Sequence, residues 1–135
     1  MTFSVAVIDD IGYGRLDERR ATELCAASFR SRGFDLDRLG EVSVALVESE
    51  VVWNLNKEFR SKDTPTDVLS FEVDGPYGEM VGEIVVSPEF ASPEMGVEEL
   101  VVHGSLHLGG MDHGEDFESS EMAEVQALVL EMVRG

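Results

Sequence analysis

The stretch GVEELVVHGSLHLGG, residues 96–110, carries apolar side chains on nearly every face of the helix that it would form. A helix of this kind is expected inside a protein rather than at its surface. Gly109 and Gly110 supply the end of the helix, because glycine readily takes the left-handed conformation that turns a chain back. We therefore predict a buried helix that stops at this glycine pair.

The segments around this helix are predicted to be strands and amphipathic helices. Alternating and β-branched residues predict strands at 2–8, 41–49, 67–73 and 81–87. Apolar residues at helical spacing predict helices at 17–32, 50–60 and 115–133. The turn DGPYGE, residues 74–79, joins the last two strands and predicts a hairpin. The expected fold class is α+β, with a single mixed β-sheet of about four strands packed with helices.

The length and composition predict one soluble domain over residues 1–135. An apolar share of 43% fits a globular chain, and no apolar run approaches the roughly 18 residues that a membrane span needs. The N-terminus has no basic leader of the kind that begins a secretory signal. Cys25 is the single cysteine, so no disulfide forms within the chain, and its apolar surroundings predict a packing residue. We expect a cytoplasmic protein that contacts no membrane.

The formal net charge of −18 is unevenly distributed along the chain. Residues 1–62 carry nine Lys and Arg against eleven Asp and Glu, whereas residues 63–135 carry one basic residue against seventeen acidic ones. A nucleic-acid surface needs clustered cations that displace counterions from phosphates. Any RNA contact is therefore expected in the N-terminal half, and the predicted RNA-facing patch consists of Lys57, Arg60, Lys62, Arg15, Arg19, Arg20, Arg30 and Arg32.

All three histidines of the chain lie within HGSLHLGGMDH, residues 103–113. His103 and His107 are one helical turn apart, so their imidazoles share a face of the predicted helix. The glycine pair then turns the chain, and His113 can return to the same point. Three neutral imidazoles leave the fourth position of a tetrahedral zinc ion to water, as in catalytic zinc sites. We predict one Zn²⁺ per chain, because imidazoles favour zinc among the divalent metals.

The end of this motif, H-x2-G-x2-H, resembles that of the metzincin proteases and predicts a metzincin-like metal-binding helix. Those proteases carry a glutamate directly after the first histidine as their general base. Gly104 occupies that position in this chain, which argues against peptide cleavage.

HGSLHLGGMDH strongly resembles the signature of the YbeY endoribonucleases, the metal-dependent proteins of bacterial ribosomal RNA maturation. Two further segments are similar to blocks of this family, LNKEFRSKDTPTDVLSF at 55–71 and GEIVVS at 82–87. The resemblance runs from about residue 44 to residue 113. Two departures concern the shape of the substrate site: the segment before His103 is short for the family, and Met111 stands where tyrosine is common.

This resemblance implies a zinc-dependent endoribonuclease that cuts single-stranded RNA. It implies a role in small-subunit rRNA 3′-end processing and ribosome quality control, with the ribosome or ribosomal proteins as further partners. It also implies that His103, His107 and His113 bind the zinc and that Arg60 is the catalytic arginine of the second block. The planar guanidinium of an arginine suits this role, because it can hold phosphate oxygens bidentately while their charge grows. The oligomeric state is not predicted.

Alternatives remain open for the function and for single residues. The chain could be a zinc hydrolase of another substrate, including peptides, or a ribosome-associated factor whose zinc is structural. Arg60 could be a surface arginine paired with Glu58 or Asp63. Asp67 and Asp112 are equally consistent with a place in a turn and with orienting a metal ligand. Ser70 and Ser105 are predicted to be structural.

Overall fold

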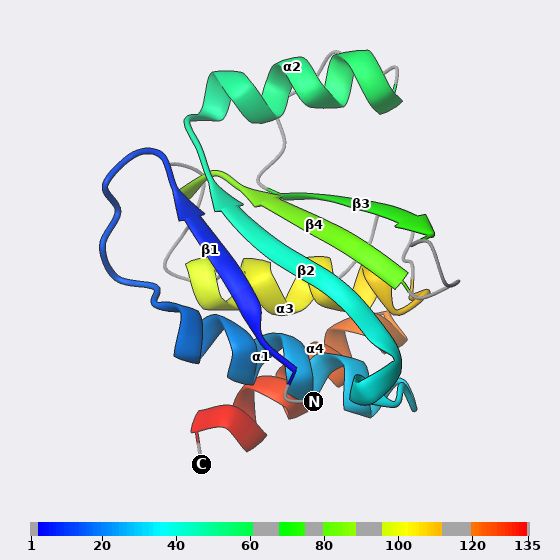
Figure 1. Cartoon of the computed structure of the whole chain (residues 1–135). Helices are drawn as coiled ribbons and strands as arrows, with labels where there is room; N and C mark the ends of the chain where they lie inside the picture. The colour runs from blue at the N-terminus through cyan, green and yellow to red at the C-terminus, as the bar shows by residue number, and fades with distance from the viewer. Residues whose placement is uncertain (1–2, 61–67, 75–79, 89–95, 112–119, 135) are drawn as a thin grey trace.

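The computed structural model describes residues 3–60, 68–74, 80–88, 96–111 and 120–134 (Figure 1). In chain order the elements are β1 (Val5–Asp9), α1 (Glu18–Ser31), the 3-10 turn η1 (Leu36–Arg38), β2 (Leu39–Leu46), α2 (Ser49–Arg60), β3 (Val68–Asp74), β4 (Met80–Val86), α3 (Val97–Leu108) and α4 (Glu121–Arg134). The described elements include both helices and strands, with β3 next to β4 and α3 next to α4, which confirms the predicted α+β class.

The four strands form one mixed sheet in the order β1-β2-β4-β3. β2 lies between β1 and β4 and pairs with both in parallel. β3 pairs antiparallel with β4, from Val68 opposite Val86 to Asp74 opposite Met80, which confirms the predicted hairpin. β3 is therefore an edge strand, and it is the only antiparallel one among the strands that the structure describes.

Helices cover the two faces of the sheet unequally (Figure 1). α1, α3 and α4 lie together on one face, where the larger apolar core includes Leu24, Phe29 and Leu106. Among the helices of the described residues, α2 is the one on the other face, over a smaller apolar cluster that includes Val52, Leu69 and Val85. Residues that alternate along the strands supply both cores, because successive side chains of a strand point to opposite faces.

α3 is the buried helix that the sequence predicts, and it approaches the sheet unusually closely. A Cβ atom at Gly104 would lie 2.6 Å from Ile84 Cγ2 and 3.2 Å from Val68 Cγ2, so only glycine fits there. The Ser70 hydroxyl of β3 donates a hydrogen bond of 2.9 Å to the Gly104 carbonyl. These contacts fix the position of α3 against β3 and β4, and they confirm that Ser70 is structural.

The start of the last helix differs from its prediction. Ser120 is not helical, and its hydroxyl accepts a hydrogen bond of 3.1 Å from the Ala123 amide. This is an N-cap, which satisfies a donor that the first turn leaves without a partner. The prediction of a helix from residue 115 is therefore wrong, because α4 begins at Glu121; residues 115–119 lie outside the described part.

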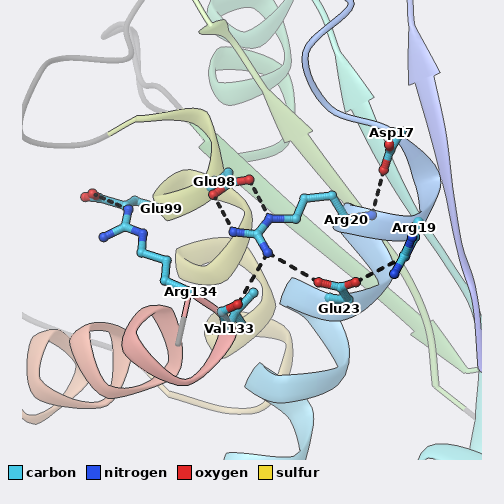
Figure 2. Close-up of polar contacts among 8 residues, drawn as sticks. All are labelled: Asp17, Arg19, Arg20, Glu23, Glu98, Glu99, Val133 and Arg134. Atoms are coloured by element: carbon cyan, nitrogen blue, oxygen red, sulfur yellow. Dashed lines mark hydrogen bonds and ion pairs between the residues drawn. The ribbon is translucent and has the colours of Figure 1, made fainter.

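Arg20 of α1 ties three helices together (Figure 2). Its Nε atom lies 2.6 Å from Glu98 Oε2, and its Nη2 atom lies 3.1 Å from Glu98 Oε1, at the start of α3. The same guanidinium donates to Glu23 and to the Val133 carbonyl at the end of α4. Arg20 is thus engaged inside the protein, which removes it from the expected RNA-contacting cations.

The ion pair between Arg20 and Glu98 also changes the titration of Glu98. Hydrogen bonds from Arg20 hold the pKa of the Glu98 carboxyl below its ordinary value of 4.5. A carboxyl whose pKa is lowered by folding adds stability above its unfolded pKa, and this stability is lost as the pH falls through the lowered value. The pair therefore stabilises the contact between α1 and α3 throughout the neutral pH range.

In the described part of the chain, none of the helices is long and apolar enough to span a membrane.

Candidate metal centre

Two imidazoles meet at the C-terminal end of α3. His103 and His107 are four residues apart, and their Nε2 atoms lie 3.1 Å from each other. The ring centroids are separated by 4.7 Å, and the ring planes cross at 72°. His103 is only 8% exposed, whereas His107 is half-buried. The helical spacing has thus placed the two rings at one point, as the sequence predicts.

The Met111 carbonyl fixes the protonation of the outer ring. His107 Nδ1 lies 3.0 Å from this carbonyl oxygen. A carbonyl can only accept a hydrogen bond, so Nδ1 of His107 must carry the proton. In the neutral ring Nε2 then presents its lone pair to His103.

The turn after α3 places this carbonyl. The Met111 amide donates to the Leu106 carbonyl and the Gly110 amide to the His107 carbonyl, both at 3.0 Å. This is the bond pattern of a Schellman turn, and Gly110 has the positive φ of 92° that the turn requires. The predicted glycine stop is confirmed. Because the backbone of Met111 makes the contact, the departure from tyrosine at this position leaves it intact.

Gln126 of α4 holds the inner ring. Its Oε1 atom lies 3.0 Å from His103 Nδ1, and both side chains are buried. With an amide oxygen as acceptor, Nδ1 of His103 carries the proton and Nε2 again presents a lone pair. The sequence analysis missed Gln126, because a lone glutamine on an amphipathic helix has no motif around it. Its place on the buried face of the last helix was the available signal.

The two lone pairs require a positive species between them. Two unprotonated Nε2 atoms repel each other at 3.1 Å unless a proton or a cation is shared. A tetrahedral zinc ion at 2.0–2.1 Å from each ligand spaces its ligand atoms about 3.4 Å apart. The observed separation is near this value, so the pair fits two ligands of one metal ion. An imidazole held through its other nitrogen is typical of such ligands.

The third predicted ligand cannot be placed. His113 lies outside the described residues, as do Asp112, Asp63 and Asp67. Within the described residues, no three His, Cys, Asp or Glu side chains are gathered in a way that could hold a metal. The structure therefore brings two of the three predicted ligands together.

Gly104 cannot carry a general base in this fold. The position next to His103 faces the sheet, where Ile84 and Val68 exclude any side chain. A glutamate at this position would displace α3 from the sheet rather than reach the imidazoles. This agrees with the argument against peptide cleavage, while the likeness of α3 to the metzincin helix stays a prediction.

The other predicted residues fall in three places. Arg60 is the last residue of α2, on the face of the sheet opposite α3. Ser105 is fully buried and its hydroxyl donates to the Val101 carbonyl at 2.8 Å, which confirms a packing role. Cys25 is also buried, and loss of solvent raises the pKa of its thiol to about 12, which confirms an unreactive packing residue.

Comparisons with known proteins agree on one family. Residues 15–134 match the family model described as Endoribonuclease YbeY. A protein named Endoribonuclease YbeY from Rubrobacter xylanophilus is 65% identical over 136 residues, covering 100% of this chain and 99% of the relative. One of the same name from Azorhizobium caulinodans is 32% identical, over 92% of this chain and 87% of the relative.

A solved structure also matches. The solution structure of a protein from Thermotoga maritima superposes with a TM-score of 0.50 and 28% sequence identity. The match covers 96% of this chain and 88% of that one. The likeness therefore extends over nearly the whole fold and is not confined to the histidine motif.

Proposed function

The chain belongs to the YbeY family and is an endoribonuclease, and we propose that it hydrolyses single-stranded RNA with one zinc ion held by His103, His107 and His113. The observation that carries the metal assignment is the convergence of two Nε2 lone pairs at 3.1 Å. Gln126 and the Met111 carbonyl support it, because each holds one ring in the tautomer that a ligand needs.

Each residue has a separate task in this proposal. A bound zinc ion would polarise a phosphoryl oxygen and make water a nucleophile near neutral pH. The two described histidines orient their Nε2 atoms, and α3 keeps them rigid because Gly104 and Ser70 fix the helix to the sheet. Arg60 would bind the non-bridging oxygens of the scissile phosphate.

The biological substrate in this proposal is ribosomal RNA. The likeness to the family supports a role in small-subunit rRNA 3′-end processing and in ribosome quality control, in contact with the ribosome. A reduced Cys25 thiol, fully buried, is consistent with the proposed cytoplasmic location.

RNA cleavage tests this function directly. The zinc-loaded protein is expected to cut an end-labelled single-stranded rRNA fragment, to leave the same fragment intact in a duplex, and to leave an unstructured peptide intact. A chelator should stop the reaction and added zinc should restore it. Cleavage of the peptide but not of the RNA would favour another zinc hydrolase, and zinc retention without any cleavage would favour a structural metal.

Gln126→Ala is expected to weaken zinc binding about 10- to 100-fold, because the His103 ring loses the acceptor that orients it. Competition with a chromophoric chelator measures this affinity without relying on activity. Gln126→Glu keeps an acceptor and should restore most of the affinity. Ser28→Ala removes another buried hydroxyl, which bonds to the Leu24 carbonyl within α1, and serves as the control. Equal affinities of Gln126→Ala and wild type would exclude this role.

A further inference from the structure

α2 has two flanks, one on either side of its buried stripe. Val52 and Asn56 are buried against the sheet, and Trp53 is 43% exposed beside them. Lys57 and Arg60 follow Trp53 at the i+4 and i+7 positions, so their backbones lie on the same flank of the helix. Val51 and Glu58 belong to the opposite flank. The Trp53 side of α2 therefore combines an exposed indole with two cationic positions, and it also carries one acidic position, Glu50, three residues before Trp53.

This combination is unusual within this protein. The large exposed apolar side chains in the described part are Ile8, Val51, Trp53, Leu128 and Met132, and Trp53 is the only aromatic one. Single exposed apolar side chains need no explanation by themselves. Here, however, the aromatic residue stands beside cations in a chain whose net charge is −18.

Three other cations already have carboxylate partners within the chain. Arg20 binds Glu98 and Glu23, Arg19 lies 3.5 Å from Glu23, and Arg134 lies 3.6 Å from Glu99. Lys57 makes no ion pair with any residue that the structure describes, and it is exposed. It is therefore available to a phosphate.

The flank is also connected to the histidine centre. α2 packs against β3, with Leu69 in the cluster beneath it, and α3 packs on the other face of β3 through Ser70. β3 is an edge strand, so the two helices are separated by one strand at the margin of the sheet (Figure 1). A flexible strand of nucleic acid that passes this edge can reach both.

We propose that the Trp53 flank of α2 is a binding surface for single-stranded RNA, on which Trp53 stacks on a base and Lys57 contacts a phosphate. This inference rests on the proposed function and adds a contact outside the metal centre. Every base has a face that can stack on an indole, and neighbouring cations bind the backbone, so such a surface is tolerant of sequence. It holds the RNA while the scissile bond lies at the histidines.

Trp53 is the only tryptophan of the chain, so its fluorescence reports this surface alone. Addition of a single-stranded oligouridylate of about 12 nucleotides to the zinc-loaded protein is expected to quench the emission in a saturable manner. Trp53→Ala should raise KM for RNA cleavage about tenfold and leave kcat and zinc content unchanged. Trp53→Phe, which can still stack, should restore most of the affinity.

Two matched variants separate stacking and charge from general effects. Val51→Ala truncates a side chain of similar exposure, 42%, on the opposite flank and should leave KM unchanged. Lys57→Ala should reduce the slope of log KM against log salt by about one phosphate contact, whereas Arg134→Ala, which removes a cation from the end of α4, should not.

The outcomes distinguish this inference from the proposed function. If the wild type cuts RNA while its fluorescence does not change and Trp53→Ala has the KM of Val51→Ala, the surface is excluded and the nuclease assignment stands. If the wild type does not cut RNA, the proposed function fails. In that case saturable quenching still supports the surface, and unchanged emission excludes it.

Discussion

Replacing His107 with alanine is expected to remove the bound zinc and to lower kcat/KM for RNA cleavage by roughly three orders of magnitude or more. The Nε2 atoms of the half-buried His107 and the buried His103 lie 3.1 Å apart, so loss of either would leave the proposed zinc ion with too few ligands. Metal analysis of the purified variant and single-turnover cleavage of an rRNA fragment measure the two effects.

The control for this variant lies on the same helix. Ser105→Ala removes a buried hydroxyl that bonds to the Val101 carbonyl and to Cys25 on the side of α3 away from the histidines. It should keep both zinc and activity, and circular dichroism should show that both variants are folded. A His107→Ala protein that retains one zinc ion and cuts RNA at the wild-type rate would contradict the assignment of this ligand.

Arg60→Ala is expected to lower kcat about 100- to 1000-fold while the zinc content stays at the wild-type level. The reason is that the guanidinium is proposed to bind phosphate oxygens whose negative charge grows in the transition state, and no metal ligand is touched. Arg60→Lys keeps the charge but not the planar fork, so we expect an intermediate rate. Initial rates at saturating RNA give kcat without a contribution from substrate binding.

The alternative role of Arg60, a surface pair with Glu58, makes a different prediction. In that case Glu58→Gln should lower the activity as much as Arg60→Ala, because either change breaks the pair. Our proposal requires Glu58→Gln to behave as wild type. An Arg60→Ala protein with unchanged kcat would remove Arg60 from the catalytic site.

The part of the candidate metal centre that lies on α3 and the turn after it could be predicted from local sequence patterns. The i, i+4 spacing of His103 and His107 and the glycine stop act within a few residues, and the structure confirms both. Gln126 could not be found in this way. Its contact with His103 joins two residues that are 23 positions apart in the chain, and it depends on how α4 packs against α3.

The same distinction holds for the fold. The hairpin of β3 and β4 follows from a short turn, whereas the parallel pairing of β2 with β4 crosses two intervening elements and has no local signature. Arg20 illustrates the limit for surface charges. Its sequence neighbours suggest a free cation, but its partner Glu98 is 78 residues away, and only the packing of α1 on α3 brings them together.

A zinc titration of the metal-free wild type, with RNA cleavage recorded at each step, tests the central claim most directly. Our account predicts no cleavage without metal and a linear rise in rate that reaches its maximum at one zinc ion per chain. Cleavage by the metal-free protein at the full rate, or a rate that does not depend on zinc up to and beyond one equivalent, would contradict it.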